Sequence, residues 1–356
     1  MAKVVVGMSG GVDSAAAAWL LKKAGYEVIG LTLKTWQAEG GKESRCCEIT
    51  DAEKAAWKIG IPFYVKNCVA EFADRVTLPF MEDYLSGRTP NPCILCNPLI
   101  KWEGLLSFAD QMRADYVATG HYASVVRMEN GRFSVRKGAD SSRDQTYMLC
   151  RLTQDQLRRT IMPLGNLTKE EVRRIAAAAD LPVALKPDSQ EICFVTQGTY
   201  ADFIEEHYEG EIPGDGNFID EQGQVLGRHK GIIRYTVGQR KGLGLSMGKP
   251  VYVKKIDPVR NEVVAADKSS LSAGEILCDR ASFMGIGDLS EDEELFCLCK
   301  IRYHHREQEA VVKKVPGGML SVRFPGKVTA PAPGQAAAFY DKEGRILGSG
   351  IISQVL

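Results

Sequence analysis

The sequence lacks a net charge, a long hydrophobic run and a high density of cysteines. Its 356 residues carry 45 Lys and Arg against 45 Asp and Glu, so the formal net charge is zero and composition alone argues against a nucleic-acid partner. No run approaches the roughly 18 apolar residues of a membrane helix, and the N-terminus shows no signal-like charged and apolar stretch. We expect a cytoplasmic protein that does not bind a membrane.

Ten cysteines are too few for a disulfide scaffold of this size, so we expect them to remain thiols, catalytic groups or metal ligands. Hydrophobic residues make up 44% and charged residues 25%, an ordinary globular composition that excludes disorder, collagen and coiled coil. The length exceeds the usual roughly 100 to 200 residues per domain, which predicts two or three domains.

Strand and helix patterns alternate in the first part of the chain. Lys3 to Gly7 is a valine run typical of a buried parallel strand, and a glycine loop and an Ala-rich helix through Lys23 follow it. Further strands are predicted at 27–33, 62–65 and 116–118, and helices at 51–59 and 71–85. This alternation predicts an α/β fold, a parallel sheet with helices on both faces.

Beyond this sheet the pattern changes twice. Residues 144–207 read as helical, with Thr153 and Thr168 as helix caps and Thr168-Lys169-Glu170-Glu171 as a capping box. After Gly210, short β-branched runs alternate with Gly and Pro, which is typical of small β-barrels or sandwiches. We therefore expect an α/β domain with a helical extension (1–209), a central small β domain (210–270) and a C-terminal β-barrel domain (271–356).

The loop Ser9-Gly10-Gly11-Val12-Asp13-Ser14 stands directly between the first strand and the first helix. Its glycines permit a tight turn with converging N–H groups, and the helix N-terminus adds partial positive charge, so the loop can cradle an anion. No Gly-Lys-Ser/Thr follows, which separates it from a Walker A loop. The alternative is a tight turn with Asp13 in the first helical turn for dipole reasons.

Two cysteine segments stand out. Cys93-Ile94-Leu95-Cys96 is expected in a Pro-rich loop before a helix at 97–112, and Cys193 lies in a second irregular loop, 186–194. Zinc is a competing use, but structural zinc needs paired motifs, and Cys46-Cys47 and Cys297-x-Cys299 lack that spacing. The latter pair fits one face of a strand, and the remaining cysteines, Cys68, Cys150 and Cys278, fit core positions.

The glycine loop resembles the signature of the ATP pyrophosphatase (PP-loop) family, whose members transfer AMP to a substrate oxygen and release pyrophosphate. Together with the cysteine segments, Gly120-His121-Tyr122-Ala123 and Arg143-Asp144-Gln145-Thr146-Tyr147, the chain resembles the tRNA-specific 2-thiouridylases over essentially its whole length. This resemblance implies ATP and Mg²⁺ as cofactors, and it implies thiolation of C2 of the wobble uridine in Lys, Glu and Gln tRNAs.

The resemblance also implies roles for individual residues. Cys193 would carry a persulfide, and Cys96 would be the second catalytic thiol, which attacks the persulfide or resolves it as a disulfide. The ATP positions would be Gly7, Met8, Ser9, Gly10, Gly11, Val12, Asp13, Ser14, Leu33 and Gly120. The target base would meet Asn91, Pro92 and Cys93. The tRNA contacts would be His121, Arg143, Asp144, Gln145, Arg302, Tyr303 and Gln335.

Cys93 is a departure, because many members of that family carry Asp at this position. With Cys96 and Cys193 it makes three thiols that could hold three corners of a [4Fe–4S] cluster, so a cluster route and a cluster-free persulfide route both remain open.

His121 can be interpreted either as a structural residue or as a site residue. A lone histidine is usually structural, but the end of a parallel strand is where α/β sheets bind ligands.

Charge is distributed unevenly along the chain. Residues 223–260 hold nine cations and one acid, Asp257, whereas residues 199–221 hold eight acids and no Lys or Arg. The cations are Arg228, Lys230, Arg234, Arg240, Lys241, Lys249, Lys254, Lys255 and Arg260. Such segregation suggests a face that meets a phosphate backbone, and the alternative is a solvated β surface with incidental bias.

The expected partners are tRNA and a sulfur donor, either a persulfide carrier protein or sulfide, for an enzyme acting as a monomer. Two other functions stay open. One is a PP-loop ligase or amidotransferase that adenylates a small molecule, and the other is a non-catalytic RNA-binding protein on an inactive nucleotide fold.

Overall fold

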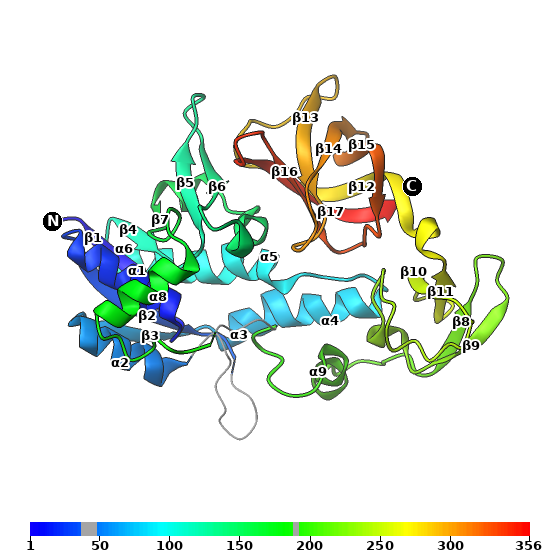
Figure 1. The fold of residues 1–356 in the computed structure, drawn as a ribbon, viewed down its shortest axis with the longest axis horizontal. Helices are drawn as coiled ribbons and strands as arrows, with labels where there is room; N and C mark the ends of the chain where they lie inside the picture. The colour runs from blue at the N-terminus through cyan, green and yellow to red at the C-terminus, as the bar shows by residue number, and fades with distance from the viewer. Residues whose placement is uncertain (37–47, 188–191) are drawn as a thin grey trace.

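A computed structural model describes residues 1–36, 48–187 and 192–356. Its N-terminal domain is built on a five-stranded sheet with the order β3-β2-β1-β4-β7, and all neighbouring pairs are parallel (Figure 1). The strands are β1 (Lys3–Gly7), β2 (Glu27–Lys34), β3 (Phe63–Asn67), β4 (Tyr116–Ala118) and β7 (Thr160–Ile161). The predicted parallel α/β domain is confirmed.

Helices cover both faces of this sheet. Val4 and Val6 of β1 pack in one core with α1 (Val12–Lys23) and α2 (Ile49–Ile59). Val5 points the other way, into a core shared with α6 (Glu103–Gln111). Because successive side chains of a strand alternate between faces, a strand buried on both sides needs an unbroken apolar run. This is why the valine run identifies β1 so clearly.

The helices α3 (Val69–Phe72) and α4 (Leu78–Leu85) are joined by a π-helical turn at Ala73–Thr77, within the helix predicted at 71–85. The prediction that Cys93 and Cys96 lie in a loop is wrong. They lie in α5 (Pro92–Cys96), which continues through π-helical Asn97–Trp102 into α6. The Asn91 side chain accepts a hydrogen bond from the Cys93 N–H at 3.1 Å, so it caps a helix whose first residue is proline.

The predicted helical extension contains α7 (Gln154–Arg158), α8 (Lys169–Ala178) and α9 (Tyr200–His207). Thr153 and Thr168 cap their helices, as predicted, and the predicted capping box at Thr168 is present; Thr153 and Thr199 form capping boxes that were not predicted. A hairpin that was not predicted, β5 (Ala123–Arg127) with β6 (Phe133–Lys137), precedes this region. No helix in the described parts of the chain is long and apolar enough to cross a membrane.

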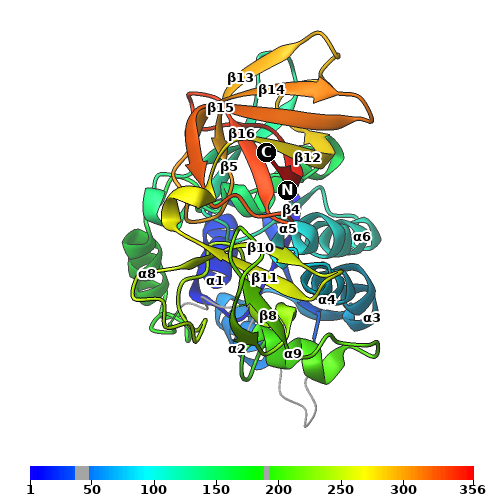
Figure 2. The same cartoon turned by 90° about the vertical axis from the view of Figure 1, so that its right-hand side faces the viewer.

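Two β units follow, as predicted (Figure 2). The central sheet has the order β10-β11-β8-β9, and the last six strands close into a barrel with the order β12-β15-β14-β13-β16-β17. The central strands are β8 (Gly216–Ile219), β9 (Val225–His229), β10 (Tyr252–Asp257) and β11 (Glu262–Ala266). The barrel strands are β12 (Ser272–Phe283), β13 (Glu294–Lys300), β14 (Gln308–Val315), β15 (Met319–Thr329), β16 (Ala336–Tyr340) and β17 (Ile346–Val355).

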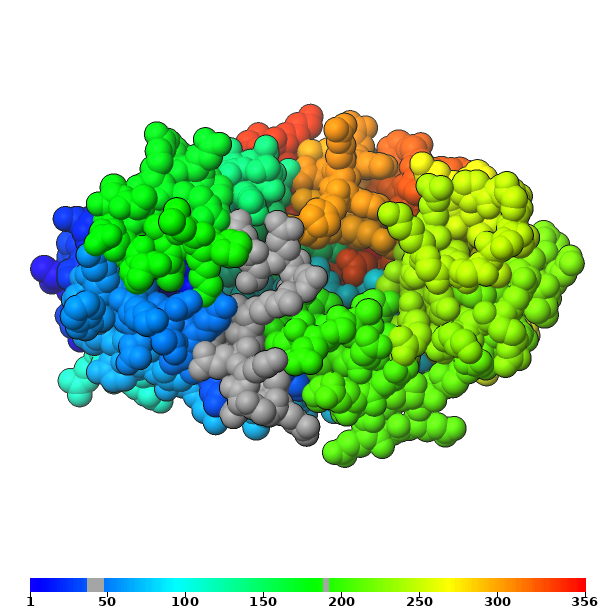
Figure 3. Space-filling view, turned by 60° about the horizontal axis from the view of Figure 1, so that its bottom comes forward, coloured from blue at the N-terminus to red at the C-terminus, as the bar shows by residue number. Residues whose placement is uncertain are grey.

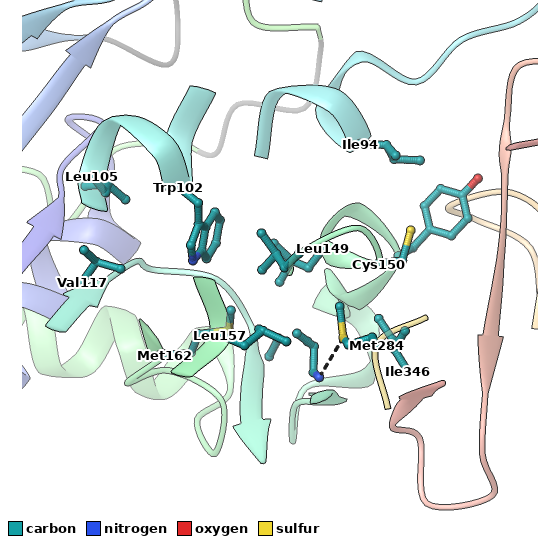
Figure 4. Close-up of a cluster of buried hydrophobic side chains, with 14 of the residues drawn as sticks. Ile94, Trp102, Leu105, Val117, Leu149, Cys150, Leu157, Met162, Met284 and Ile346 are labelled. Carbon is teal, nitrogen blue, oxygen red and sulfur yellow. Dashed lines mark hydrogen bonds between the residues drawn. The ribbon is translucent and has the colours of Figure 1, made fainter. Parts of the chain in front are cut away.

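The barrel shares a hydrophobic core with the first domain (Figure 4). Met284 and Ile346 from the barrel belong to the same buried cluster as Leu149 and Trp102. The Val135 N–H donates to Met284 Sδ at 3.3 Å, which is the dashed contact in that view. Further hydrogen bonds cross the same boundary, from Arg132 to the carbonyls of Met284 and Phe283 and from Gln154 to Met284. The barrel is therefore fixed to the hairpin and to the segment after it.

Candidate active site

The glycine loop lies where β1 ends, at the carboxyl edge of the parallel sheet. Ser14 Oγ accepts a hydrogen bond from the Ser9 N–H at 3.2 Å and donates to the Gly11 carbonyl at 3.0 Å, which closes the loop on itself. Gly10 has φ +81°, and a Cβ there would lie 2.5 Å from the Glu48 carbonyl oxygen. Only glycine fits this position, and the loop leads directly into α1, so its geometry suits a phosphate.

Other predicted ATP positions gather at the same edge. Gly7 is in register with Leu31 of β2, and the Met8 N–H donates to the Leu31 carbonyl at 2.8 Å. Leu33, near the end of β2, packs against two of the hydrophobic cores. A Cβ on Gly120 would lie 2.7 Å from the Asp13 carbonyl carbon, so Gly120 approaches the loop backbone directly. Their contact with ATP stays a prediction.

The Asp13 carboxylate is paired with two residues, Lys169 and Tyr122, to which the sequence analysis assigned no role in the site. Lys169 Nζ lies 2.7 and 2.8 Å from the two Asp13 carboxylate oxygens, and the Tyr122 hydroxyl donates to Oδ1 at 2.7 Å. This pairing compensates a carboxylate that would otherwise repel phosphates. Lys169 stands within the capping box of α8, but nothing in the local sequence links it to a loop so far upstream.

A second lysine, Lys186, supports the other side of the loop. Its ammonium group donates to the Gly10 carbonyl at 3.3 Å and to the carboxylates of Glu48 and Asp51. Burial lowers the pKa of Lys186, but the hydrogen bonds to Asp51 and Glu48 outweigh it and raise that pKa above its usual value. Lys186 is therefore charged near pH 7, but its two carboxylate partners compensate that charge, so its contribution to the loop is the hydrogen bond to Gly10.

His121 follows β4 and lies beside Gly120. Its Nδ1 is 2.8 Å from Thr119 Oγ1, and its ring lies 5.7 Å from the Trp102 ring between centroids. Burial, with a smaller contribution from the positive charge of Lys101, lowers the pKa of His121 to about 3. The imidazole is therefore neutral near pH 7, and it can donate or accept a hydrogen bond but carries no charge for a phosphate.

The two predicted catalytic cysteines pack against one hydrophobic cluster. Cys96 is a buried member of it, and Cys193 is partly buried against it. Phe194, which follows Cys193, is 1% exposed, and its ring lies 5.6 Å from Phe72 and 5.3 Å from Phe80 between centroids. Phe194 therefore anchors the Cys193 segment on the α3–α4 region, a role that the sequence analysis missed although the aromatic stands next to the cysteine.

The residues predicted to meet the target base sit at the start of α5. Asn91 caps the helix, Pro92 is buried, and Cys93 is partly exposed. Tyr303, from the loop after β13, lies nearby: burial raises its pKa most, and Asp144 and Cys93 raise it further. The barrel thus brings an aromatic ring to the α5 start.

Most of the predicted tRNA contacts lie where the domains meet. Asp144 is buried and paired with Lys300 of the barrel at 3.3 Å, and the Gln145 side chain accepts from the Tyr122 N–H at 2.9 Å. The Gln335 amide donates to the Thr89 carbonyl at 2.7 Å. The Asp144 and Gln335 side chains thus join the barrel to the first domain, whereas the Gln145 bond lies within the first domain. Whether they also touch tRNA stays a prediction.

Arg143 and Arg302 differ from the residues at that junction. Arg143 is partly exposed at the end of the short helical turn 141–143. Arg302 donates to the Val237 carbonyl at 2.7 Å, while its Nε is buried without a hydrogen-bond partner in the described chain. Burial lowers the pKa of Arg302. A buried donor without a partner is costly and would gain from an acceptor brought by a ligand.

The three cysteines Cys93, Cys96 and Cys193 do not converge as a metal site would. In the ranges that the structure describes, no three Cys, His, Asp or Glu side chains are grouped closely enough to hold a metal ion. In this conformation the thiols therefore do not fit a [4Fe–4S] cluster. Cys46-Cys47 and the segment 188–191 beside Cys193 lie outside the described residues. The predicted core cysteines Cys68, Cys150 and Cys278 are buried, as is Cys299.

The basic and acidic segments partly neutralise each other. Arg234 pairs with Asp202 and Glu205, Lys230 with Asp215 and Lys254 with Glu221. Lys249 pairs with Asp267. Five cations of the segment have no ion pair among the described residues: Arg228, Arg240, Lys241, Lys255 and Arg260.

Figure 3 shows a depression between the barrel (orange) and the green to yellow-green region of α9 and the central domain.

Three family models match successive parts of the chain. The tRNA methyl transferase HUP domain matches residues 2–197, the tRNA methyl transferase PRC-barrel domain 201–267 and the aminomethyltransferase beta-barrel domain 274–352. Full-length relatives are also similar. The tRNA-specific 2-thiouridylase MnmA of Lachnoclostridium phytofermentans is 47% identical over 359 residues, 99% of each chain. MnmA 2 of Caldanaerobacter subterraneus is 47% identical over 360 residues, 99% of this chain and 98% of that one.

Solved structures are more distant. The U34-tRNA thiolase NcsA from Methanococcus maripaludis, determined with its [4Fe-4S] cluster, has a TM-score of 0.35 and 20% identity over 58% of this chain and 63% of that one. A 4-thiouridine synthetase–RNA complex with bound ATP has a TM-score of 0.36 and 16% identity, covering 58% of this chain and 50% of that one.

Proposed function

Because the chain belongs to the tRNA-specific 2-thiouridylase family, it is a tRNA sulfurtransferase, and we propose that it thiolates C2 of the wobble uridine of Lys, Glu and Gln tRNAs with ATP. One observation carries the proposal: Cys96 and Cys193, far apart in the sequence, pack against one cluster, and Leu33 joins that cluster to the sheet edge with the glycine loop. Sulfur transfer needs two thiols and an activated oxygen in one place.

The glycine loop is proposed to bind the β- and γ-phosphates of ATP, with Mg²⁺ arriving on the nucleotide. The uridine O2 then attacks the α-phosphorus and pyrophosphate leaves. This step is required because a pyrimidine carbonyl oxygen is a poor leaving group, whereas AMP is a good one. The N-terminus of α1 supplies positive potential, Lys186 bonds the Gly10 carbonyl of the loop, and Lys169 keeps the Asp13 carboxylate engaged.

Cys193 is proposed to carry a persulfide whose terminal sulfur attacks C2 and expels AMP. The Cys96 thiolate then attacks the Cys193 sulfur, which releases the thiocarbonyl and leaves a Cys96–Cys193 disulfide. The two cysteines are oxidised and the transferred sulfur is reduced, so electrons balance. The persulfide would come from a carrier protein, or it would form when sulfide attacks the Cys193 sulfur of the Cys96–Cys193 disulfide, which breaks that bond and releases Cys96 as a thiolate. The [4Fe–4S] route is a prediction from which we derive no step, since the three thiols do not converge.

Mass spectrometry of tRNA nucleosides after incubation with ATP and a persulfide donor tests the proposal. We expect 2-thiouridine at the wobble position with wild-type protein and with the control Cys297→Ala, a barrel cysteine outside the site. We expect none with Cys96→Ala or Cys193→Ala. Equal thiolation by all four proteins would refute both cysteine assignments.

Two further measurements decide the remaining alternatives. Pyrophosphate release without tRNA, unaffected by Cys193→Ala, would favour the ligase or amidotransferase. A colourless, iron-free enzyme that still thiolates tRNA would exclude the cluster, whereas stoichiometric iron and sulfide after anaerobic purification would support it.

A further inference from the structure

A three-residue segment, Gly87-Arg88-Thr89, connects the end of α4 to the residues predicted to meet the target base. Pro90 follows it, and Asn91 then caps α5, so the position of this segment determines where the helix begins. At its α4 end the segment is held by Arg88. The Arg88 N–H donates to the Asp83 carbonyl at 2.8 Å, and the Arg88 side chain pairs with the Asp83 carboxylate.

Both β domains contact the segment 87–89. In the central domain, the carbonyl oxygen of Ile256 in β10 would lie 3.1 Å from a Cβ on Gly87. In the barrel, the Pro333 carbonyl accepts a hydrogen bond from the Thr89 N–H at 2.7 Å. The Gln335 amide donates to the Thr89 carbonyl, also at 2.7 Å. Both backbone polar groups of Thr89 are therefore bonded to a single stretch of the barrel, the barrel turn 333–335.

Gly334 lies at the centre of the barrel turn 333–335. Its φ is +92°, and a Cβ there would lie 3.0 Å from the Thr89 nitrogen and 3.1 Å from the Arg88 Cβ. Only glycine allows so close an approach of two backbones at this φ. The turn is fixed to β17, because the Gly334 N–H donates to the Ile352 carbonyl and the Ile352 N–H donates to the Gln335 carbonyl, each at 2.8 Å. A shift of the barrel would therefore move the segment 87–89.

The barrel also faces the start of α5 directly. The gap between them measures about 20 Å³, which is room for about one water molecule. Its lining includes Gly334 and Ile351 from the barrel, and Asn91, Ile94 and Leu95 from the cap and body of α5. The start of α5 is thus held through the segment that precedes it and by the surface that it faces.

Resting on the proposed function, we infer that Gly334 is a positioning residue, because the barrel turn 333–335 sets the place of the α5 start and of the residues predicted to meet the uridine. Thiolation requires the uridine O2 and C2 within reach of the nucleotide and of the sulfur donor, and a misplacement of about 1 Å can cost about 100-fold in rate. The affinity for tRNA comes largely from phosphate contacts. A displaced turn should therefore slow thiolation more than it weakens binding.

The test compares Gly334→Ala with the control Gly317→Ala in the full-length protein. Gly317 lies between β14 and β15 of the same barrel with φ +83°, and a Cβ there would meet nothing within 4 Å. The two variants thus share the backbone strain, and only Gly334→Ala presses on a neighbour. Hydrogen–deuterium exchange without ATP and tRNA, measured over residues 87–96, should be at least about fivefold faster in Gly334→Ala and unchanged in Gly317→Ala.

Single-turnover thiolation at saturating ATP and tRNA gives the functional readout. We expect the rate to fall at least about tenfold in Gly334→Ala and to stay within about twofold of wild type in Gly317→Ala. The KM for ATP and the Kd for tRNA should stay within about twofold of wild type in both variants. A loss of stability alone would not separate the rate from the binding constants in this way.

Gln335→Glu is a second variant, which decides the question if Gly334→Ala does not fold. It keeps the size of the side chain but removes the donor to the Thr89 carbonyl, so exchange over residues 87–96 should again be faster. Because Gln335 is also a predicted tRNA contact, exchange measured without tRNA isolates its part in the turn.

Unchanged exchange over residues 87–96 in Gly334→Ala and Gln335→Glu would overturn the inference. Equal thiolation rates in the two glycine variants would do the same, as would a tRNA Kd that rises as much as the rate falls. When wild-type protein makes 2-thiouridine, each of these outcomes refutes the positioning role alone. A wild-type protein that makes none refutes the proposed function, and the role of Gly334 in thiolation with it.

Discussion

Gly10 and Gly25 share a left-handed backbone, with φ of +81° and +89°, but differ in their surroundings. A Cβ at Gly10 would overlap the Glu48 carbonyl oxygen, whereas a Cβ at Gly25 would meet nothing within 4 Å. Both alanine variants should lose about 1–2 kcal/mol to backbone strain. Only Gly10→Ala should displace the glycine loop, and we expect it to weaken ATP binding at least about tenfold, or about 1.4 kcal/mol. Calorimetric titration with ATP measures this, and equal losses in both variants would contradict it.

His121 predicts a dependence of stability on pH. Its pKa is about 3 in the folded protein and near 6.5 when unperturbed. Between pH 3 and pH 6.5 the unfolded chain binds a proton that the folded chain does not. The contribution of neutral His121 to the free energy of unfolding is therefore fully present above pH 6.5 and decreases as the pH falls toward 3. At pH 5 the loss should be about 2 kcal/mol. Urea unfolding at pH 7 and pH 5 should show a smaller decrease for His121→Asn than for wild type. The same decrease in both proteins would refute the assignment.

At the scale of residues, the sequence identified the groups whose chemistry is local and missed those defined by tertiary contacts. The loop glycines and the cysteine pair could be recognised because their spacing carries the chemistry. Lys169 and Phe194 could not be recognised, because their roles depend on contacts with distant parts of the chain. Lys169 bonds Asp13, and Phe194 packs against the α3–α4 region. The site assignments for Asp144 and Gln335 stay predictions, and their side chains also join the domains.

The helix α8 links the extension to the glycine loop through one side chain. Lys169 lies in its first turn, immediately after the cap Thr168, and bonds both oxygens of Asp13. Lys169→Met should leave the Asp13 carboxylate uncompensated beside the nucleotide phosphates. We expect it to raise the KM for ATP about tenfold, which corresponds to about 1.4 kcal/mol. Pyrophosphate release at varied ATP concentration measures the effect.

Thr168→Ala is the matched control for that helix. Loss of the cap should cost about 1 kcal/mol of stability but leave the Lys169–Asp13 pair in place. Its KM for ATP should stay within about twofold of wild type, since the charge near the loop is unchanged. If both variants raised the KM equally, helix stability rather than the ion pair would account for the effect.

Among the elements, those with strong periodic or capping signals were predicted well. The valine strand, the helix caps Thr153 and Thr168, and the β-rich second half all appear in the structure. The start of α5 was misread because two prolines suggested a loop, although Asn before Pro is itself a helix-start signal. The two-residue strand β7 is too short to show alternation, and its pairing with β4 is set by the sheet.

At the scale of the whole molecule, the balance between free and paired cations should determine tRNA binding. Arg240 and Lys241 have no ion pair among the described residues, and Arg240 lines a surface hollow of about 370 Å³. Replacing both with Ala should weaken tRNA binding and reduce the slope of log K against log salt by about 2. Filter binding between low and high salt measures that slope.

The control replaces Lys230 and Lys254, whose charges are paired with Asp215 and Glu221. Removing two cations that already have acidic partners should change the slope by less than about 1. If the two double variants lost affinity equally, total charge rather than unpaired charge would govern binding. Composition alone could not make this distinction, because it sums charges whose pairing depends on the fold.

The three-part architecture was foreseeable from the change in pattern near Gly210 and Ser270, but the contacts between the parts were not. No local signal places Met284 and Ile346 beside Leu149, since each of these reads as an ordinary core residue of its own domain. The same holds for the buried pair of Asp144 with Lys300. Contacts across domains depend on shape as well as on apolar character.

The shared core has a consequence for how the protein is made. The ribosome synthesises the first domain before Met284 and Ile346. The apolar surface of the first domain that these two residues cover therefore stays exposed on the nascent chain until the barrel is made. Because β17 also closes the barrel, that face is sealed only when synthesis is nearly complete. Chains terminated early would therefore carry an intact glycine loop, yet they would be substrates for chaperones and proteases.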